Sequence, residues 1–332
     1  MANFDLLSIG DATIDTFMTP LESETLCTID KKQCLIAFKY GDKIPVKNLE
    51  FSIGGNAANN AVGARRLGVN TSIVLTLGQD SVGEMIVSRL KNEGVDPTYV
   101  IQQPGTTSNY STIINYSGER TIFVYHAPRS YEFPIQLPPS PWVYLTSMGE
   151  SYQPFYNHFI EWLKKNLSVK LAFNPGSWQL RGGYEAIKDV MAMTHLIYVN
   201  REEASKLTGF GESSGRERDL LIALNKLGPK ICVITDGSGG SFAYDSINGK
   251  FFKAGVLPVD AYERTGAGDA FGSGCLSALI HGKTLDEALL WGTCNSASVI
   301  GYTGSQKGLL KINEMDEWLT RCNSSGVKVE AI

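Results

Sequence analysis

Short apolar runs alternate with amphipathic segments along most of the chain. Phe4–Ile9, Ser72–Leu77 and Lys230–Thr235 are mainly apolar runs of strand length, and turn residues follow each of them. Helical patterns are expected at about 83–92, 154–166, 184–193, 267–281, 285–301 and 311–322. This alternation predicts an α/β fold with a doubly wound, mostly parallel sheet flanked by helices.

A first insertion, at about residues 16–50, interrupts the alternation. Cys34–Phe38 and Ile44–Val46 are apolar and flank the polar stretch Lys39–Lys43. Two apolar runs around such a stretch predict a hairpin that stands off the main sheet.

A second insertion lies at about residues 107–126. Asn109–Tyr116 and Arg120–Tyr125 alternate around Ser117-Gly118, which predicts another hairpin. We expect the two insertions to form a small β lid over the functional site, on one domain that spans residues 1–332.

The composition is typical of a globular enzyme. The net charge of −4 argues against a nucleic-acid surface, which needs concentrated Lys and Arg. No apolar run approaches the ~20 residues that span a bilayer, and the first residues lack a basic stretch before an apolar one. Six scattered cysteines without a C-x-x-C pair, and only four histidines, predict no zinc site and a reduced, cytoplasmic protein.

The glycine-rich stretch Arg264–Gly274 is the most informative part of the sequence. Gly266 and Gly268 allow a tight turn, and the apolar, small-residue run that follows predicts a helix whose N-terminus favours an anion. Asp269 falls in the first turn of that helix. It is either a base that removes a proton beside an anion site or a capping residue.

Two functions are considered for this stretch, dinucleotide binding and phosphoryl transfer. Gly266, Gly268 and Gly272 partly fit a dinucleotide-binding turn, but such a turn belongs in the first βαβ unit and needs a later acidic residue. Phosphoryl transfer instead needs a base and positive potential, which Asp269 and the amides of 266–269 supply. A Walker A sequence does not occur, so a P-loop enzyme is excluded.

Further polar residues follow predicted strands. Asp11 and Asp15 come after the first strand, at the edge where open α/β sheets bind ligands, although by themselves they fit solvated loop carboxylates better. Gly54-Gly55 opens a helix with Asn56, Asn59 and Asn60 in its first turns. Asparagine is a poor helix former, so these residues either cap the helix or bind a ligand.

Two more segments point to phosphates. Asp236–Gly240 is a flexible turn after a strand and suits a close approach to phosphate groups. Asn200 and Glu203 open another helix, where an acidic residue also has the ordinary role of complementing the helix dipole.

Taken together, these segments resemble the PfkB/ribokinase family of carbohydrate kinases. Gly54–Ala61 is similar to its N-terminal signature and Thr265–Phe271 to its C-terminal one. Asn200 and Glu203 match its N-x-x-E, and Thr235–Gly240 matches its T-x-G-x-x-G. The resemblance covers nearly the whole chain. It implies a ribokinase-like fold and ATP-dependent phosphorylation of a hydroxyl group on a small sugar.

The resemblance also implies roles for particular residues. The base would be Asp269, in an anion hole formed by Gly266, Ala267 and Gly268. Sugar hydroxyls would be bound by Asp11, Asp15, Gly54, Gly55 and Asn59. ATP, with Mg²⁺ held through water by Glu203, would be bound by Asn200, Glu203, Thr235, Gly237, Gly240 and Asn295.

The sequence departs from the family pattern at two positions. Glu263-Arg264 replaces the usual Asp-Thr pair, so Glu263 is the candidate for a monovalent cation such as potassium, while Arg264 offers a positive charge of its own. The usual D-P-N segment occurs as Asn174-Pro175-Gly176.

The sequence leaves the substrate open. An unphosphorylated sugar is favoured, and a nucleoside is the alternative. A third possibility is that the protein is a non-catalytic sugar or nucleotide sensor. No nucleic acid or membrane partner is expected, and a homodimer would form through the lid. A sugar phosphate would need Arg120, Arg129 or Lys47, and a nucleoside would need Phe38, Tyr40, Tyr110 or Tyr125.

Overall fold

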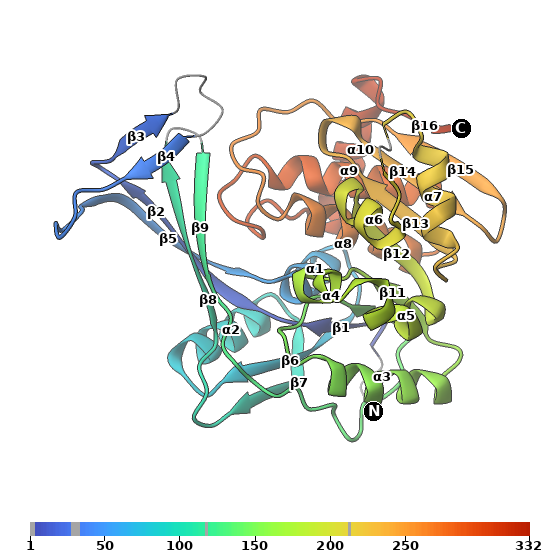
Figure 1. The fold of residues 1–332 in the computed structure, drawn as a ribbon. Helices are drawn as coiled ribbons and strands as arrows, with labels where there is room; N and C mark the ends of the chain where they lie inside the picture. Colours follow the sequence, from blue (N-terminus) through green and yellow to red (C-terminus); the bar gives the residue numbers. More distant parts are fainter. Residues whose placement is uncertain (1–3, 28–33, 117–118, 212–213) are drawn as a thin grey trace.

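The structure is a computed structural model that describes residues 4–27, 34–116, 119–211 and 214–332. Within these residues the central sheet has ten strands in the order β16-β15-β14-β13-β12-β11-β10-β1-β6-β7 (Figure 1). These strands are β1 (Leu6–Gly10), β6 (Thr71–Gly78), β7 (Asp96–Gln103), β10 (Trp142–Leu145), β11 (Lys170–Phe173), β12 (Thr194–Asn200), β13 (Ile231–Thr235), β14 (Ser241–Asp245), β15 (Lys250–Ala254) and β16 (Val329–Ala331).

The sheet is mostly parallel, as predicted. Pairing is parallel from β7 to β13 and antiparallel from β13 through β16. Leu6, Leu7 and Ile9 of β1 are all fully buried, because helices cover both faces of the parallel strands.

Two helical layers flank the central sheet. One core joins it to α3 (Gln153–Lys165), α5 (Gly183–Met193), α6 (Arg201–Thr208) and α7 (Glu217–Asn225). On the other face lie α1 (Asn56–Arg66), α2 (Ser81–Asn92), α8 (Ala267–Ile280), α9 (Leu285–Val299) and α10 (Met315–Ser324). Short helical turns are α4 (Ser177–Arg181), η1 (Gly237–Gly239) and η2 (Ile312–Glu314). The doubly wound, mostly parallel α/β fold expected from the sequence is therefore confirmed.

A separate four-stranded sheet, called the lid sheet below, projects from the central sheet (Figure 1). Its order is β5-β2-β8-β9, with bounds β2 (Thr13–Pro20), β5 (Val46–Gly54), β8 (Asn109–Tyr116) and β9 (Glu119–Tyr125). Parallel pairing of β2 with β8 joins the two insertions predicted from the sequence. The turn predicted at Ser117-Gly118 lies outside the described residues, and the extent of one domain over residues 1–332 stays a prediction.

The hairpin predicted within the first insertion is wrong in its pairing. β4 (Cys34–Ala37) pairs with β3 (Glu24–Cys27), whereas β5 pairs with β2. The apolar runs on either side of Lys39–Lys43 therefore belong to two different sheets. A turn signal shows that the chain reverses, but it does not specify which strands pair.

The expectation of reduced cysteines is also wrong for one pair. Cys27 and Cys34 form a disulfide between β3 and β4, because the antiparallel register sets them directly opposite each other. The remaining thiols are free and buried, at Cys232, Cys275, Cys294 and Cys322. Among the described residues, no helix combines the length and apolar character needed to cross a bilayer.

Candidate active site

Asp269 lies in the first turn of α8, directly after the glycine turn. Gly266 precedes the helix with φ of 79°, a left-handed conformation that glycine adopts without strain. The side-chain amide of Asn59 in α1 donates to Asp269 Oδ2 at 2.8 Å. Burial raises the pKa of Asp269 to about 6, and the Asn59 bond opposes that rise. A carboxyl group with such a pKa is largely ionised at neutral pH and accepts a proton readily.

Asn59 has most of its hydrogen-bonding capacity engaged within the protein. Its Oδ1 accepts from Ser305 Oγ at 2.8 Å and from Gln306 Nε2 at 3.1 Å. One hydrogen of its amide nitrogen points to Asp269, which leaves the second for a ligand. Ser305 and Gln306 were not found by sequence reasoning.

A small cavity of about 180 Å³ opens beside the C-terminal end of β1. It contains Asp11 and Gly55, two of the residues predicted to bind substrate. Burial raises the pKa of Asp11 to about 6, while Arg129 and the Tyr131 hydroxyl, 2.8 Å from Asp11 Oδ2, oppose the rise. Most of its other lining residues have polar side chains: Thr13, Asn56, Asn109, Ser111, His126 and Ser147, with Ala12 and Val124 beside them.

Asp15 lies in β2 next to this cavity, and it is paired in register with Ser111 of β8. Burial raises the pKa of Asp15 to about 6; Ser111 opposes the rise, and the charges of Glu263 and Asp269 add to it. A Cβ at Gly54 would lie 2.0 Å from Asp15 Oδ2, so only glycine fits beside that carboxylate. The structure thus brings Asp15 close to the acidic residues of the α8 turn.

A larger cavity of about 500 Å³ adjoins the same turn. It contains three residues predicted for the nucleotide: Thr235, Gly237 and Gly240. Ala267 and Gly268, the two residues before Asp269 in the chain, also line it. Within the described chain its lining has a single charged side chain, Arg264. Its lining also includes Val256–Val259, Thr293, Ser296 and Ala297 of α9, and Ile300, which follows α9.

Asn295 is not among the residues that line this cavity, contrary to the sequence expectation that it binds ATP. It is fully buried, and its amide donates to the Ala270 carbonyl at 2.8 Å and to Ser273 Oγ at 3.2 Å. Its Oδ1 accepts from the Leu310 backbone N–H at 2.9 Å. Asn295 is therefore fully occupied in joining α9 to α8 and to the segment that ends at Leu310.

Asn200 and Glu203 form a capping box at the start of α6. Asn200 Oδ1 accepts from the Glu203 N–H at 2.8 Å, and Glu203 Oε2 accepts from the Asn200 N–H at 2.9 Å. Burial raises the pKa of Glu203, and the charge of Asp269 contributes. In the described residues no cluster of three His, Cys, Asp or Glu side chains could hold a metal. Glu203 Oε1, a hard oxygen, fits a Mg²⁺ ion bound mainly through phosphates and water.

Glu263 does not fit the role of a cation ligand. Its Oε1 accepts from the Thr265 hydroxyl at 2.5 Å, and its Oε2 accepts from the Gly304 N–H at 3.1 Å. Arg120 of β9 lies 3.9 Å from Oε1 and supplies the opposing charge. Because protein donors and a guanidinium already surround this carboxylate, the expected potassium site at Glu263 is not supported.

The mostly parallel α/β sheet with its projecting lid sheet is the ribokinase-like fold. The chain matches the pfkB family carbohydrate kinase domain over residues 23–312, and it belongs to that family. Enzymes of this family transfer a phosphoryl group to a sugar hydroxyl, and they use ATP, usually with Mg²⁺.

Among similar proteins, an ATP-dependent 6-phosphofructokinase of Thermoanaerobacterium thermosaccharolyticum is 27% identical, over 91% of this chain and 89% of its own. A 5-dehydro-2-deoxygluconokinase of Shouchella clausii is 28% identical, over 94% of each chain. The solved Arabidopsis thaliana ribokinase, in complex with ribose and ATP, superimposes with a TM-score of 0.78 at 20% identity, over 96% of this chain and 99% of its own. That last similarity establishes the fold.

Proposed function

We propose that the protein transfers the γ-phosphoryl group of ATP to a hydroxyl group of a small, unphosphorylated sugar, with Asp269 as the base. The proposal rests on one observation, the position of Asp269 relative to the two cavities. Asp269 directly follows Ala267 and Gly268, which line the larger cavity. Its carboxylate bonds to Asn59, which stands four residues after Gly55 of the small cavity. A hydroxyl bound in the small cavity would approach a phosphoryl group bound in the larger one. Asp269 would take the proton of that hydroxyl as the phosphoryl group arrives.

The size and lining of the small cavity favour a sugar over a nucleoside. Its volume of about 180 Å³ is below the roughly 300–1,000 Å³ of pockets for drug-sized ligands. None of the aromatic candidates for a base-stacking wall is among its described lining residues, which are rich in hydroxyl, amide and carboxylate groups. These groups match a ring of hydroxyls. The aromatic candidates were Phe38, Tyr40, Tyr110 and Tyr125.

Two of the three cationic candidates for binding a sugar phosphate, Arg129 and Arg120, already have partners within the protein. Arg129 is buried and donates to the Thr76 carbonyl and, at 3.0 Å, to the Thr107 carbonyl. Arg120 faces Glu263. A phosphate on the substrate would have to displace these contacts, so an unphosphorylated sugar is favoured.

On the nucleotide side, Arg264 and the amides of Gly266, Ala267 and Gly268 would balance the charge of the phosphates. A bound Mg²⁺ would neutralise charge on the phosphates, and Glu203 would contact it through water. Arg120, rather than potassium, would neutralise Glu263. Because the proposed reaction consumes ATP, we also propose a cytoplasmic location, which fractionation of the source cells tests.

A substrate panel tests the proposal. Purified protein with ATP and Mg²⁺ is offered pentoses, hexoses, sugar phosphates and nucleosides, and ADP release is measured in potassium and in choline buffers. We expect turnover on at least one unphosphorylated sugar, at least tenfold higher in kcat/KM than on any nucleoside, and equal rates in both buffers. Preference for a nucleoside or a sugar phosphate would contradict the substrate class. ATP binding without turnover on any compound would support the sensor.

We propose that the protein forms a homodimer through the outer face of the lid sheet. Leu49, Phe51, Phe123 and Tyr125 are each more than half exposed, and the strand register sets Phe51 and Phe123 on one face, opposite to Asp15. An exposed apolar face of this kind marks an interaction surface. Sedimentation velocity should give a dimer for the wild type and a monomer for Phe51→Lys/Phe123→Lys. A wild-type monomer at tens of micromolar would contradict the proposal.

A further inference from the structure

The segment Gly304–Leu310, between α9 and η2, is held at both ends by residues to which the sequence had assigned ligand roles. The Gly304 N–H donates to Glu263, and the Leu310 N–H donates to Asn295 at 2.9 Å. Glu263 precedes α8 and Asn295 lies in α9. One end of the segment is therefore fixed to the residues just before the glycine turn, and the other end is fixed to α9.

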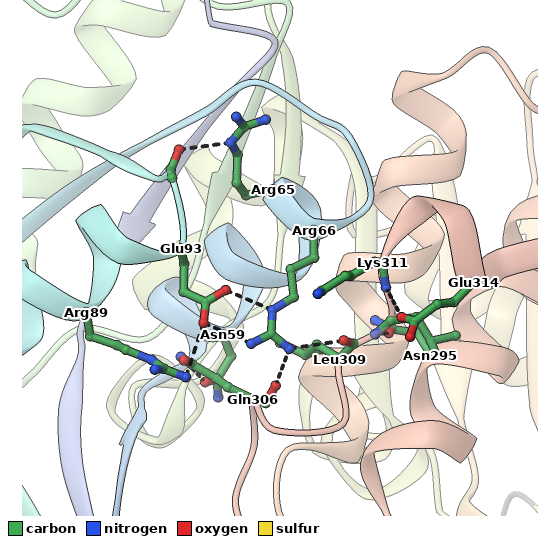
Figure 2. Close-up of polar contacts among 12 residues, drawn as sticks. Asn59, Arg65, Arg66, Arg89, Glu93, Asn295, Gln306, Leu309, Lys311 and Glu314 are labelled. Carbon is green, nitrogen blue, oxygen red and sulfur yellow. Dashed lines mark hydrogen bonds and ion pairs between the residues drawn. The ribbon is translucent and has the colours of Figure 1, made fainter.

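Arg66, in the last turn of α1, holds the middle of the segment. Its guanidinium donates to the carbonyls of Gln306, at 2.8 Å, and Leu309, at 3.1 Å (Figure 2). Two further nitrogens, Nε and Nη2, bind the carboxylate oxygens of Glu93 at 2.9 Å each. The Arg66 and Glu93 side chains are only 14% and 15% exposed, so the guanidinium is fixed by a two-pronged, largely buried ion pair.

The other side of the segment contacts Asn59, as Figure 2 shows. Ser305 and Gln306 both donate to Asn59 Oδ1. If the side-chain amide of Asn59 were flipped, its oxygen would face the Asp269 carboxylate and its NH₂ group would face the NH₂ group of Gln306. Neither pair could form a hydrogen bond. The two donors from the segment therefore determine that the nitrogen of Asn59 points to Asp269.

We propose that Gly304–Leu310, clamped by Arg66, is a positioning element that orients Asn59 to donate to Asp269. Arg66, Ser305 and Gln306 are thus positioning residues that act on the base through Asn59. The inference rests on the proposed role of Asp269 as the base. In this proposal Glu263 and Asn295 bind no ligand; they hold the two ends of the segment instead.

Several titratable groups surround Asp269 besides its bond to Asn59. Asp15 comes from β2, Glu203 from α6, and Tyr144 from β10, and each is electrostatically coupled to Asp269. Arg66 touches none of these three in the contacts described for it, so its replacement changes the carboxyl group only through Asn59.

The test measures the Asp269 carboxyl group directly. Carbon-13 NMR titration of aspartate-labelled protein, with the Asp269 signal assigned from Asp269→Asn, gives its pKa with or without a known substrate. In Arg66→Gln and in the double variant Ser305→Ala/Gln306→Leu we expect that pKa to rise by about one unit, because the N–H that stabilises the charged form is no longer fixed. Kinetics on the sugar identified by the panel should show kcat reduced about threefold at pH 6.5, because the ionised fraction of the base falls by that factor, with KM for ATP unchanged.

Arg65→Gln is the matched control. Arg65 is the neighbouring residue on α1, and its side chain bonds only to the Gly94 carbonyl in the contacts described for it, at 2.9 Å, so its loss should leave the Asp269 titration unchanged. A lower unfolding temperature in Arg66→Gln and in the double variant, with an unchanged Asp269 pKa, would overturn the proposal. If Arg66→Gln fails to fold, the double variant, which leaves the ion pair intact, decides. A wild type without any kinase activity would refute the proposed function but would leave the titration result interpretable.

Discussion

Replacing Asp269 by asparagine should lower kcat by about 10²–10⁴-fold, the usual contribution of a positioned general base. Asparagine has the same shape, and its oxygen still accepts from Asn59, but it cannot take a proton from the sugar hydroxyl. ATP affinity should change little, because the larger cavity is lined by Ala267 and Gly268 and not by the carboxylate itself. Steady-state kinetics and calorimetric titration with ATP measure the two effects.

The same variant has a stability signature that separates lost chemistry from misfolding. The pKa of Asp269 is about 6 in the folded protein, above its ordinary value of 3.8, so ionisation of this group opposes folding as the pH rises from about 4 to 6. At pH 7 the asparagine variant should therefore unfold at or above the wild-type temperature. A kcat above one tenth of the wild-type value in a folded variant would refute the assignment of the base.

Replacing Gly266 by alanine should lower kcat by about 10²-fold or more, similar to the loss of a donor in an anion hole. A Cβ at Gly266 would lie 2.4 Å from Ser305 Cβ and 2.6 Å from its Cα, and the left-handed backbone costs a further ~1–2 kcal/mol for a residue with a side chain. The clash displaces both the α8 turn and the segment Gly304–Leu310. A lower unfolding temperature should accompany the loss of turnover.

Gly268→Ala is the comparison for Gly266→Ala within the same glycine turn. A Cβ there meets no described atom within 4 Å, so the protein should unfold at the wild-type temperature. Because Gly268 lines the larger cavity, the change should appear mainly in KM for ATP. Thermal unfolding and kinetics of the two variants check the contrast, and equal unfolding temperatures would contradict it.

Elements with a strong local pattern were predicted well from the sequence. β1 and α8 depend on apolar runs and glycine turns within a few residues, and both occur close to the predicted bounds. β7 and α7 were missed. β7 is an edge strand whose residues are mostly half-buried, so it lacks a continuous apolar run. α7 has no capping side chain at its start, so no local sequence signal marks where this helix begins.

The error at Asn295 has a similar physical cause. α9 is buried on most of its circumference, so no apolar stripe distinguishes the side that faces the large cavity from the side that packs on α8. Thr293, Ser296 and Ala297 line that cavity, while Asn295 points to Ala270 and Leu310. Only the packing of α9 against α8 determines which of these neighbours faces a ligand.

By itself the sequence determined the α/β alternation and the glycine turns that bring amides and carboxylates to the strand ends, because these depend on neighbouring residues. The tertiary structure decided what each side chain contacts. Tyr131 reaches Asp11 across 120 positions of sequence, and Ser305 and Gln306 reach Asn59 across 246 and 247. Such contacts arise from the packing of distant elements, which leaves no local signal in the chain. The contacts of Ser305 and Gln306 orient Asn59 toward Asp269. The packing of the lid sheet likewise pairs Arg120 with Glu263.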